Sequence, residues 1–454
     1  MNRTTLAISG VAALSVLALA SACAPGSNSG QPSKKPTSAV STDVAKAGKV
    51  TLTVWDQEVR GGQDASIKTL NDEFQKKYPN VKIKRVSKSF TNLKDTLKLA
   101  LSGKNPPDVV EANQGYGDMG AFVQAGMLLP LNSYADVYGW RQRYPKTLLD
   151  LNSFTSDGKK FGQGNLYGVS RTGEIVGVYY SKKKLKQAGL SKPATWADFT
   201  SDLAKMKGKD TLPVSMGSKG DDAYTLIHLF GVIQDRSAAK QDIVDTVFGK
   251  GGKSWDTPAN KKAATTLGEW AKKGYITPGT NGTGFDQAAS DFAHGKSAFL
   301  ITGTWETPDL QKTMKGDLGF FAPPPTSAGA MPYTTGGEGL PWSITAKSKH
   351  PDVAAAYLDF MSNAHAADVT AQNGDLPAVS PASAKPAPGA QTDVFNAWTR
   401  LSKGNGFVPY LDYTTPTFYD TLTSQFQQLV GGKTTPDRCV GALQKDYSGF
   451  EGKR

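Results

Sequence analysis

The stretch VTLTVW at residues 50–55 alternates valine and leucine with threonine, which is the two-residue period of a β-strand. A stripe of apolar residues with helical spacing follows between Ile67 and Tyr78, and it stops at Pro79. Residues 81–86 (VKIKRV) then alternate again and predict a second strand. The folded part of the chain is therefore expected to begin with a strand, a helix and a strand.

The same alternation continues outward from this unit. Leucines between residues 93 and 101 predict a second helix, which Gly103 closes, and PDVVEA at residues 107–112 predicts a third strand. EIVGVYY at residues 174–180 has the continuous apolar character of a buried strand. Strands that alternate with helices favour an α/β fold, in which helices cover the faces of a parallel sheet.

Helices and long loops are also predicted farther along the chain. Thr195 and Asp198 have the spacing of a capping box, which predicts the start of a helix. Further helices are expected at residues 263–273, 352–362 and 418–430. Proline and glycine predict a long irregular segment at residues 322–339, and an exposed excursion is expected at residues 377–390.

The N-terminal residues 1–22 are typical of a secretion signal, with an early arginine and an apolar run at residues 6–20. The sequence LASAC at residues 19–23 resembles a bacterial lipobox, in which Cys23 would receive a lipid and become the new N-terminus. Residues 23–48 are rich in serine, proline, glycine, lysine and threonine and predict a lipid-anchored flexible tether. Ordinary secretion with an incidental cysteine is the alternative.

Composition limits the class of protein. The chain has 454 residues, 38% of them hydrophobic and 20% charged, which suits two or more globular domains. If Cys23 carries a lipid, Cys439 has no partner, so no intrachain disulfide is expected. Four scattered histidines lack the spacing of ligands, so neither a metal nor a cofactor is predicted. The net charge of +12 is spread among acidic residues, and secretion argues against nucleic acid as a partner.

The order of short motifs resembles that of bacterial extracellular solute-binding proteins of ABC importers, in the sugar-binding group. Each motif is weak alone, and the resemblance depends on their order from about Val50 to the C-terminus. The motifs are TVW at 53–55, LSG at 101–103, PDVV at 107–110, GML at 126–128, LYGV at 166–169, VYY at 178–180, AGL at 188–190, PATWADF at 193–199, GKSAF at 295–299, GTW at 303–305, PWSI at 341–344 and GDLPA at 374–378. Ser181 departs from the family, which commonly has Asn there, and this puts only the local turn in doubt.

The resemblance implies a two-lobed, periplasmic-binding-protein-like α/β fold of type II, with a ligand cleft between lobes joined by hinge strands. One lobe would comprise residues 49–168 and 339–372, and the other residues 169–338 and 373–454. The expected crossings are residues 167–174, 333–339 and 373–377. The resemblance also implies a monomer that binds a carbohydrate, expected to be an oligosaccharide, and delivers it to ABC permease subunits from the outer face of the cell membrane.

A sugar has hydroxyl groups at its edges and apolar C–H faces, so its site needs aromatic rings together with carboxylates and amides. The aromatic candidates are Trp305, at a position where the resembled family often stacks its sugar, Trp342 and Phe418. Because ligands of open α/β sheets bind outside the carboxyl ends of strands, the polar candidates follow predicted strands or lie at crossings. They are Gln57, Glu58, Asn113, Gln114, Asp118, Arg171, Glu174, Asp375 and, for backbone freedom, Gly337. Core packing, solvated loops and helix caps are the alternatives.

The sequence also contains features that bear on other functions. GYGDMG at residues 115–120 matches the G-x-G-x-x-G pattern of dinucleotide sites, but Tyr116 and Asp118 would crowd and repel a pyrophosphate. No catalytic residue is assigned, because neither H-E-x-x-H nor G-x-S-x-G occurs, and the chain is predicted not to be an enzyme. An extracellular glycosidase stays an alternative, since a carboxylate pair can form in any fold, as does binding of a polyamine or a peptide.

Overall fold

Two large β-sheets organise the residues that a computed structural model describes, which are residues 39–452. These described residues belong to one compact unit. The expected signal and the lipidation of Cys23 lie outside the described residues, as does most of the expected tether. Residues Val44–Ala47 form a 3₁₀ helix, and Val44 is buried. The folded part therefore begins before residue 49, which corrects the expected end of the tether.

The first sheet contains the strands that open the sequence pattern. It comprises β1 (Val50–Asp56), β2 (Val81–Ser87), β3 (Val109–Glu111) and β11 (Trp342–Ile344), in the order β11-β3-β1-β2. β1 runs parallel to β2 and β3, whereas β11 runs antiparallel to β3. The alternation of β1 turns Val50, Leu52 and Val54 into the core, because successive side chains point to opposite faces of a strand.

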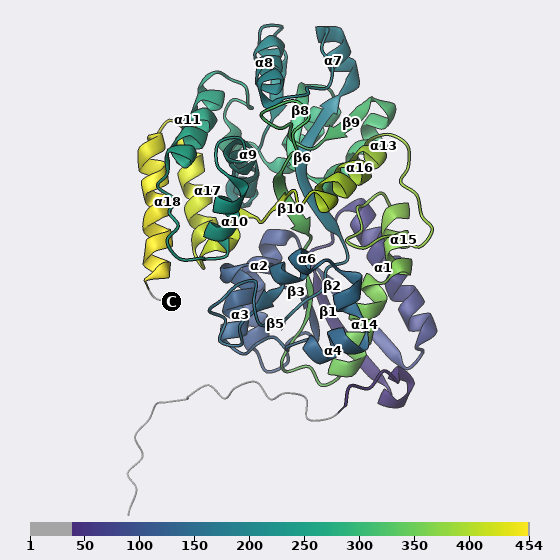
Figure 1. The fold of residues 1–454 in the computed structure, drawn as a ribbon. Coiled ribbons are helices and arrows are strands. Elements are labelled where there is room, and N and C mark those ends of the chain that lie inside the picture. The colour runs from purple at the N-terminus through teal and green to yellow at the C-terminus, as the bar shows by residue number, and fades with distance from the viewer. Residues whose placement is uncertain (1–38, 453–454) are drawn as a thin grey trace, which may run out of the picture. The chain divides into compact units, whose positions relative to one another are not determined.

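Four long helices accompany this first sheet (Figure 1). We call the sheet and these helices together the first lobe. The helices are α1 (Gly61–Lys77), α2 (Phe90–Ser102), α14 (Pro351–Ser362) and α15 (Ala364–Gln372). The predicted stripe of α1 is buried, and Phe74 meets Tyr357 of α14 edge-on with ring centroids 5.3 Å apart. The C-terminal half of the sequence thus completes the core of the first lobe.

The second sheet is built around a long central strand. Its strands are β6 (Gly173–Ser181), β7 (Leu212–Ser215), β8 (Ser297–Gly303), β9 (Leu318–Phe321), β10 (Thr334–Glu338) and β12 (Phe407–Val408). Their order is β12-β10-β6-β8-β7, and β9 also pairs with β6. Every residue of β6 except Tyr180 is buried, which explains its continuous apolar run. The second lobe consists of this sheet and its helices.

Ten helices belong to the second lobe. They are α7 (Lys182–Ala188), α8 (Trp196–Lys207), α9 (Tyr224–Gln234), α10 (Lys240–Val247), α11 (Pro258–Lys272), α12 (Phe285–Ala293), α13 (Thr307–Met314), α16 (Ala390–Lys403), α17 (Phe418–Val430) and α18 (Pro436–Glu451). Helices α9, α11, α17 and α18 pack together (Figure 1). Residues 225–234 of α9 are all buried, so this helix forms the centre of that group.

Shorter elements lie between the two sheets in the sequence. They are a π-helix (Tyr116–Gly120), α3 (Ala121–Gln124), α4 (Asn132–Val137), α5 (Trp140–Arg143), α6 (Lys146–Leu151), and the paired strands β4 (Ser153–Phe154) and β5 (Asn165–Leu166). The glycine pattern at residues 115–120 therefore forms the start of a helical segment. A Cβ at Gly115 would come within 2.4 Å of the Tyr413 Cα, so glycine permits this close approach.

The chain passes between the lobes at three segments that hydrogen-bond to one another. Backbone N–H groups donate from Val169 to Trp342 (3.1 Å), from Gly339 to Thr172 (2.9 Å) and from Gly173 to Leu376 (2.8 Å). The side chain of Ser170 also donates to the Gly339 carbonyl at 2.8 Å. The predicted two-lobed fold with joining strands is confirmed.

Most predicted elements are confirmed, and one irregular segment is corrected. The helices expected at residues 263–273, 352–362 and 418–430 fall in α11, α14 and α17. The segment expected to be irregular at residues 322–339 contains β10. Two glycines concealed this strand, and they have a packing reason, because a Cβ at Gly336 would lie 2.5 Å from the Glu174 carbonyl oxygen.

The excursion expected at residues 377–390 is exposed only in part. Pro377 and Ala378 are buried, and the Asp368 carboxylate accepts hydrogen bonds from the backbone N–H groups of Ser383 (2.8 Å) and Ala384 (2.7 Å). These bonds hold the segment to α15, a long-range contact that composition alone does not reveal.

Two helix starts agree with expectation. Thr195 and Asp198 form the predicted capping box at the start of α8. Ser181 accepts a hydrogen bond from the Lys184 N–H (3.1 Å) and donates to Asp317 (2.7 Å), so it caps α7 without the amide that the family commonly has.

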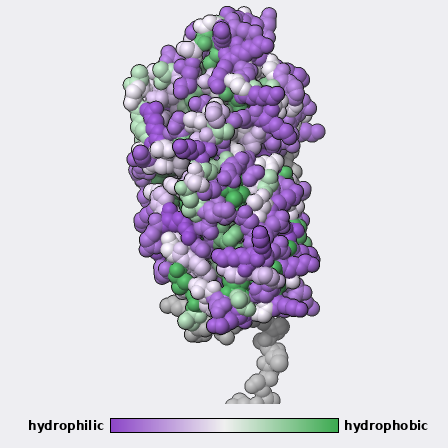
Figure 2. Space-filling model, turned by 90° about the vertical axis from the view of Figure 1, so that its right-hand side faces the viewer, coloured by the Kyte–Doolittle hydropathy of each residue, from purple (hydrophilic) through white to green (hydrophobic). Residues whose placement is uncertain are grey.

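The described surface is mainly polar. Figure 2 shows one face on which hydrophilic side chains predominate and apolar residues are scattered. Among the described residues, the large apolar side chains that stand exposed are Val59, Leu99, Val137 and Met331. In this part of the chain, no helix combines the length and apolar character needed to span a bilayer.

Candidate functional site

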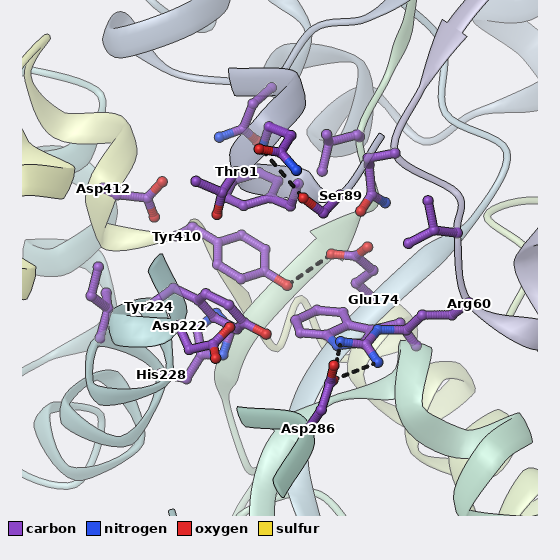
Figure 3. A pocket seen from close by; sticks show the side chains of 18 of the residues that line it. Arg60, Ser89, Thr91, Glu174, Asp222, Tyr224, His228, Asp286, Tyr410 and Asp412 are labelled. Carbon is purple, nitrogen blue, oxygen red and sulfur yellow. Dashed lines mark hydrogen bonds and ion pairs between the residues drawn. The ribbon is translucent and has the colours of Figure 1, made fainter. Parts of the chain in front are cut away.

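A cavity of about 760 Å³ lies between the two lobes (Figure 3). Gln57, Ser89 and Asn113 line it from the first lobe, and Glu174 and Trp305 line it from the second. The volume falls within the usual range for small-molecule sites, and the wall combines aromatic rings with polar groups.

Trp305 reaches the cavity from the end of β8. It lies in a 3₁₀ helix, Thr304–Glu306, and the hydroxyl of Thr304 accepts a hydrogen bond from the Ile175 N–H at 3.2 Å. A Cβ at Gly303 would come within 1.9 Å of the Trp305 ring, so a residue without a side chain is needed two positions before it. The local sequence Gly-Thr-Trp therefore sets the position of this ring.

Three aromatic rings surround His228 on α9. The ring centroid of His228 lies 5.3 Å from that of Tyr224, 5.6 Å from that of Trp305 and 5.6 Å from that of Tyr410. His228 is 6% exposed, and its Nδ1 has no hydrogen-bond partner among the described residues. Burial lowers the pKa of His228 to about 3, so the imidazole is neutral at physiological pH and can accept a hydrogen bond from a ligand.

Glu174 supplies a buried carboxyl group at the start of β6. The hydroxyl of Tyr410 donates a hydrogen bond to its Oε2 at 3.0 Å, as Figure 3 shows. Burial raises the pKa of Glu174 to about 8, although the bond from Tyr410 opposes that shift. At neutral pH this side chain is therefore mainly protonated and can donate a hydrogen bond to a ligand oxygen.

Two amides follow strands of the first lobe, where the sheet topology led us to expect them. The backbone N–H of Gln57 donates to the Glu111 carboxylate at 2.7 Å, which fixes the end of β1 beside β3. Asn113 comes two residues after β3, and its side chain donates to Asp118 at 3.3 Å. Both Gln57 and Asn113 line the cavity.

Arg60 connects the two lobes at the edge of the cavity. Its Nη1 lies 3.0 Å from the Glu306 Oε1 and 3.3 Å from the Asp286 Oδ1. Its guanidinium also lies 5.3 Å from the ring centroid of Phe285. Burial raises the pKa of Glu306 to about 7, and the charge of Arg60 opposes this shift. Figure 3 shows Arg60 and Asp286 directed toward each other.

Three predicted residues form a buried network beside the cavity instead of lining it. Arg171 donates to Glu58 at 3.2 Å and to Thr370 at 2.9 Å. Asp375 is 1% exposed, and burial raises its pKa well above the usual range. Glu58, Arg171 and Asp375 thus act within the crossing region, and their contact with a ligand stays a prediction.

Three further predicted residues also lie outside the cavity wall. The Gln114 side chain donates to the Gly339 carbonyl and accepts from the Tyr413 hydroxyl, both at 3.0 Å. Asp118 accepts from Asn113, as described above. Gly337 lies in β10 with a φ of 137°, and a Cβ there would meet Leu151 at 2.8 Å. Gly337 therefore serves close packing in this structure.

Two aromatic candidates pack in the core, the alternative that the sequence left open. Trp342 is 1% exposed and meets Tyr357 edge-on at 6.1 Å between ring centroids. Phe418 is 0% exposed and lies 4.8 Å from the ring centroid of Trp255. Neither ring lines the cavity, because each completes a hydrophobic cluster.

Several cavity residues were missed by sequence reasoning. They are Arg60, Asp222, Tyr224, His228, Tyr410 and Asp412. One signal was present for His228, since a histidine in the middle of the otherwise apolar run of α9 needs a polar reason to be there. Tyr410 and Asp412 lie at the start of a short 3₁₀ helix, Leu411–Thr414, before α17, and no local pattern distinguishes such residues.

The structure offers no assembled metal site within the described residues. There, no cluster of three or more histidine, cysteine, aspartate or glutamate side chains is arranged to hold a metal ion. Cys439 is a free, buried thiol in α18, and burial raises its pKa to about 12.

Comparison with known families places the chain in one of them. The family described as bacterial extracellular solute-binding protein matches residues 60–368, which is more than half of the sequence. The chain belongs to this family of binding proteins.

The chain shares less than a third of its aligned residues with the individual relatives described here. The chain is 25% identical over 326 residues to the multiple sugar-binding protein of Streptococcus mutans, covering 71% of this chain and 73% of the relative. It is 29% identical over 330 residues to the maltodextrin-binding protein MdxE of Bacillus subtilis, covering 70% of each. A solved chitin oligosaccharide binding protein superimposes with a TM-score of 0.78 at 23% identity, covering 89% of this chain and 99% of that one. At that identity the last comparison supports the fold alone.

Proposed function

We propose that this protein binds an oligosaccharide outside the cell and delivers it to an ABC importer. The observation that carries this proposal is a cavity in which a half-buried tryptophan, Trp305, adjoins buried hydrogen-bonding groups, Glu174 and His228. The names of the relatives from S. mutans and B. subtilis support a saccharide as the ligand.

The chemistry of the wall suits this ligand class. Aromatic rings bind the apolar faces of sugar rings, while amides and carboxyl groups pair with hydroxyl groups. Selectivity follows because a polar group left unpaired in a closed site is costly. The amides of Gln57 and Asn113 line the cavity from the first lobe, and the ring of Trp305 lines it from the second lobe. A ligand that contacts both would therefore join the lobes on binding.

Binding is proposed to close the lobes about the crossing segments. The lobes would comprise residues 49–168 with 339–372, and residues 169–338 with 373–454. Periplasmic binding proteins, whose fold this chain shares, close around their ligands by a hinge motion. The closed protein would then present the ligand to membrane permease subunits, as a monomer.

Anchoring is proposed to occur through a lipid on Cys23. The apolar segment before this cysteine and its small neighbours support lipidation. Several acyl chains on one residue would hold the protein stably, since one chain alone gives marginal binding. The protein would then act at the outer face of the membrane.

A single assay separates binding from catalysis. We expect saturable binding of at least one oligosaccharide by calorimetry, together with a raised melting temperature, because a ligand that binds only the folded state stabilises it. Chromatography of the same mixture should recover the saccharide unchanged. Release of shorter products would refute a pure binding role. The absence of a binding signal with every saccharide tested would refute the proposed ligand class.

A further inference from the structure

The charge of the cavity wall is opposite in sign to that of the chain. The whole sequence has a net charge of +12. The cavity wall contains five acidic residues and two basic ones. The acidic residues are Glu174, Asp222, Asp286, Asp309 and Asp412, and the basic ones are Arg60 and Lys219.

The acidic excess persists when exposed groups are set aside. Asp286, Asp309 and Lys219 are exposed, so water and salt screen their charges. Glu174 is mainly protonated at neutral pH, so the less exposed charged groups of the wall are then two carboxylates, on Asp222 and Asp412, and one guanidinium. Figure 3 shows Asp222 and Asp412 near Tyr410, whose hydroxyl is directed toward Glu174.

Apart from the exposed Lys219, the cations near the wall already have partners. Arg60 is held by Glu306 at 3.0 Å and by Asp286 at 3.3 Å. Lys94 does not line the cavity, and its ammonium lies 3.5 Å from the ring centroid of Tyr419. An anionic group inside the cavity would therefore meet carboxyl groups and a guanidinium whose charge is compensated.

We propose that this cavity selects its ligand by charge, taking neutral and amine-bearing oligosaccharides and rejecting acidic ones such as uronates. This rests on the proposed function. A carboxylate taken out of water needs a cationic partner, and burying it beside other carboxylates is unfavourable. An ammonium group would instead donate charge-assisted hydrogen bonds to Asp222 or Asp412.

The test uses matched ligands on the full chain. Maltotriose, cellotriose, raffinose and the trimer of N-acetylglucosamine are screened by calorimetry as neutral probes. For the tightest of these, each primary hydroxyl is separately oxidised to a carboxylate or replaced by an amine. We expect the best carboxylate derivative to bind about 100-fold more weakly than its parent, and the best amine derivative to bind at least as well.

The outcomes separate this inference from the proposed function. A carboxylate derivative that binds as tightly as its parent would overturn the charge selection and leave saccharide binding intact. Equal weakening by carboxylate and amine would also overturn it, because shape and not charge would then decide. If none of the neutral trimers binds, the proposed function fails first.

A variant tests which carboxyl group is responsible. Asp412→Asn should reduce the ratio of carboxylate to parent dissociation constants, because it removes an acidic group from the wall. The matched control is Asp437→Asn, which changes an exposed carboxylate on α18 that does not line the cavity. An unchanged ratio in both Asp412→Asn and Asp222→Asn would contradict the proposed role of these carboxylates.

Discussion

The Nη1 of Arg60 lies 3.0 Å from the Oε1 of Glu306, although the two residues belong to different lobes. Arg60 precedes α1 in the first lobe, whereas Glu306 follows β8 in the second. The Glu306 side chain is 3% exposed, so water screens this ion pair only weakly. The pair therefore ties the lobes together beside the cavity, and opening of the lobes would break it.

Replacing Arg60 should weaken ligand binding by destabilising the closed arrangement. We expect Arg60→Gln to cost about 1–3 kcal/mol of binding free energy, mostly as faster dissociation. Protonation of Glu306 limits the loss, since its pKa of about 7 lets it become neutral. Surface plasmon resonance measures the rate. The control is Arg141→Gln, which removes an exposed ion pair with Asp136. Equal dissociation rates in both variants would contradict the proposal that the ion pair of Arg60 and Glu306 stabilises the closed lobes.

Trp305→Ala should reduce saccharide affinity by about 1–3 kcal/mol, because an aromatic face that covers a sugar ring is lost. Trp305→Phe should restore part of that loss. Calorimetry measures both variants. The control is Trp196→Ala, which removes a ring that stacks on Trp270 away from the cavity. If Trp305→Ala leaves affinity unchanged, Trp305 is not part of the site.

His228→Phe should lower affinity without lowering thermal stability. The Nδ1 of His228 is buried without a hydrogen-bond partner in the described residues, so an apolar ring of similar size removes an unsatisfied group. We expect an affinity loss of about tenfold, from one missing hydrogen bond. Because the pKa of His228 is about 3, the contribution of this residue should stay constant between pH 5 and pH 8. A marked fall in melting temperature would indicate a structural role instead.

Stability without ligand should fall as the pH rises. Burial raises the pKa of Glu174 and of Glu338 to about 8 and that of Glu306 to about 7, whereas an unfolded glutamate titrates near 4.5. Between these values the folded state binds more protons than the unfolded state, so the free energy of unfolding decreases with pH. The stabilisation is complete below the unfolded pKa and is lost as the pH passes the folded pKa.

Calorimetric melting from pH 5 to pH 8 checks this sign. We expect the melting temperature to drop by several degrees over that interval. Glu338→Gln should flatten the curve, since it removes one titrating group, while the exposed Glu269→Gln should not. A melting temperature that rises toward pH 8 would contradict the protonated state of these carboxyl groups.

Cys23→Ala should release the protein from the membrane into the medium, because the acyl attachment is lost. Cell fractionation measures the distribution. The control is Cys439→Ala, which removes the buried thiol of α18 and leaves the N-terminal segment intact. Membrane association that persists in Cys23→Ala would refute lipidation at this residue.

Part of the site could be read from the sequence because it depends on strand ends. Gln57 and Asn113 follow strands whose period predicts a parallel sheet, and both line the cavity. Glu174 and Trp305 likewise border strands of the second sheet and line it. Trp342 shows the limit of this reasoning, because an apolar pattern does not distinguish a ring in the core from a ring that faces a ligand.

By itself the sequence determined the α/β character, most helices and strands, and the order of motifs that links the chain to its family, since these depend on neighbours within a few residues. Only the tertiary structure decided which distant groups meet. Tyr410 bonds Glu174 across 236 positions, and Arg60 reaches Asp286 across 226. Periodicity tells which face of an element is buried, but the partner of that face is chosen by the packing of the whole chain.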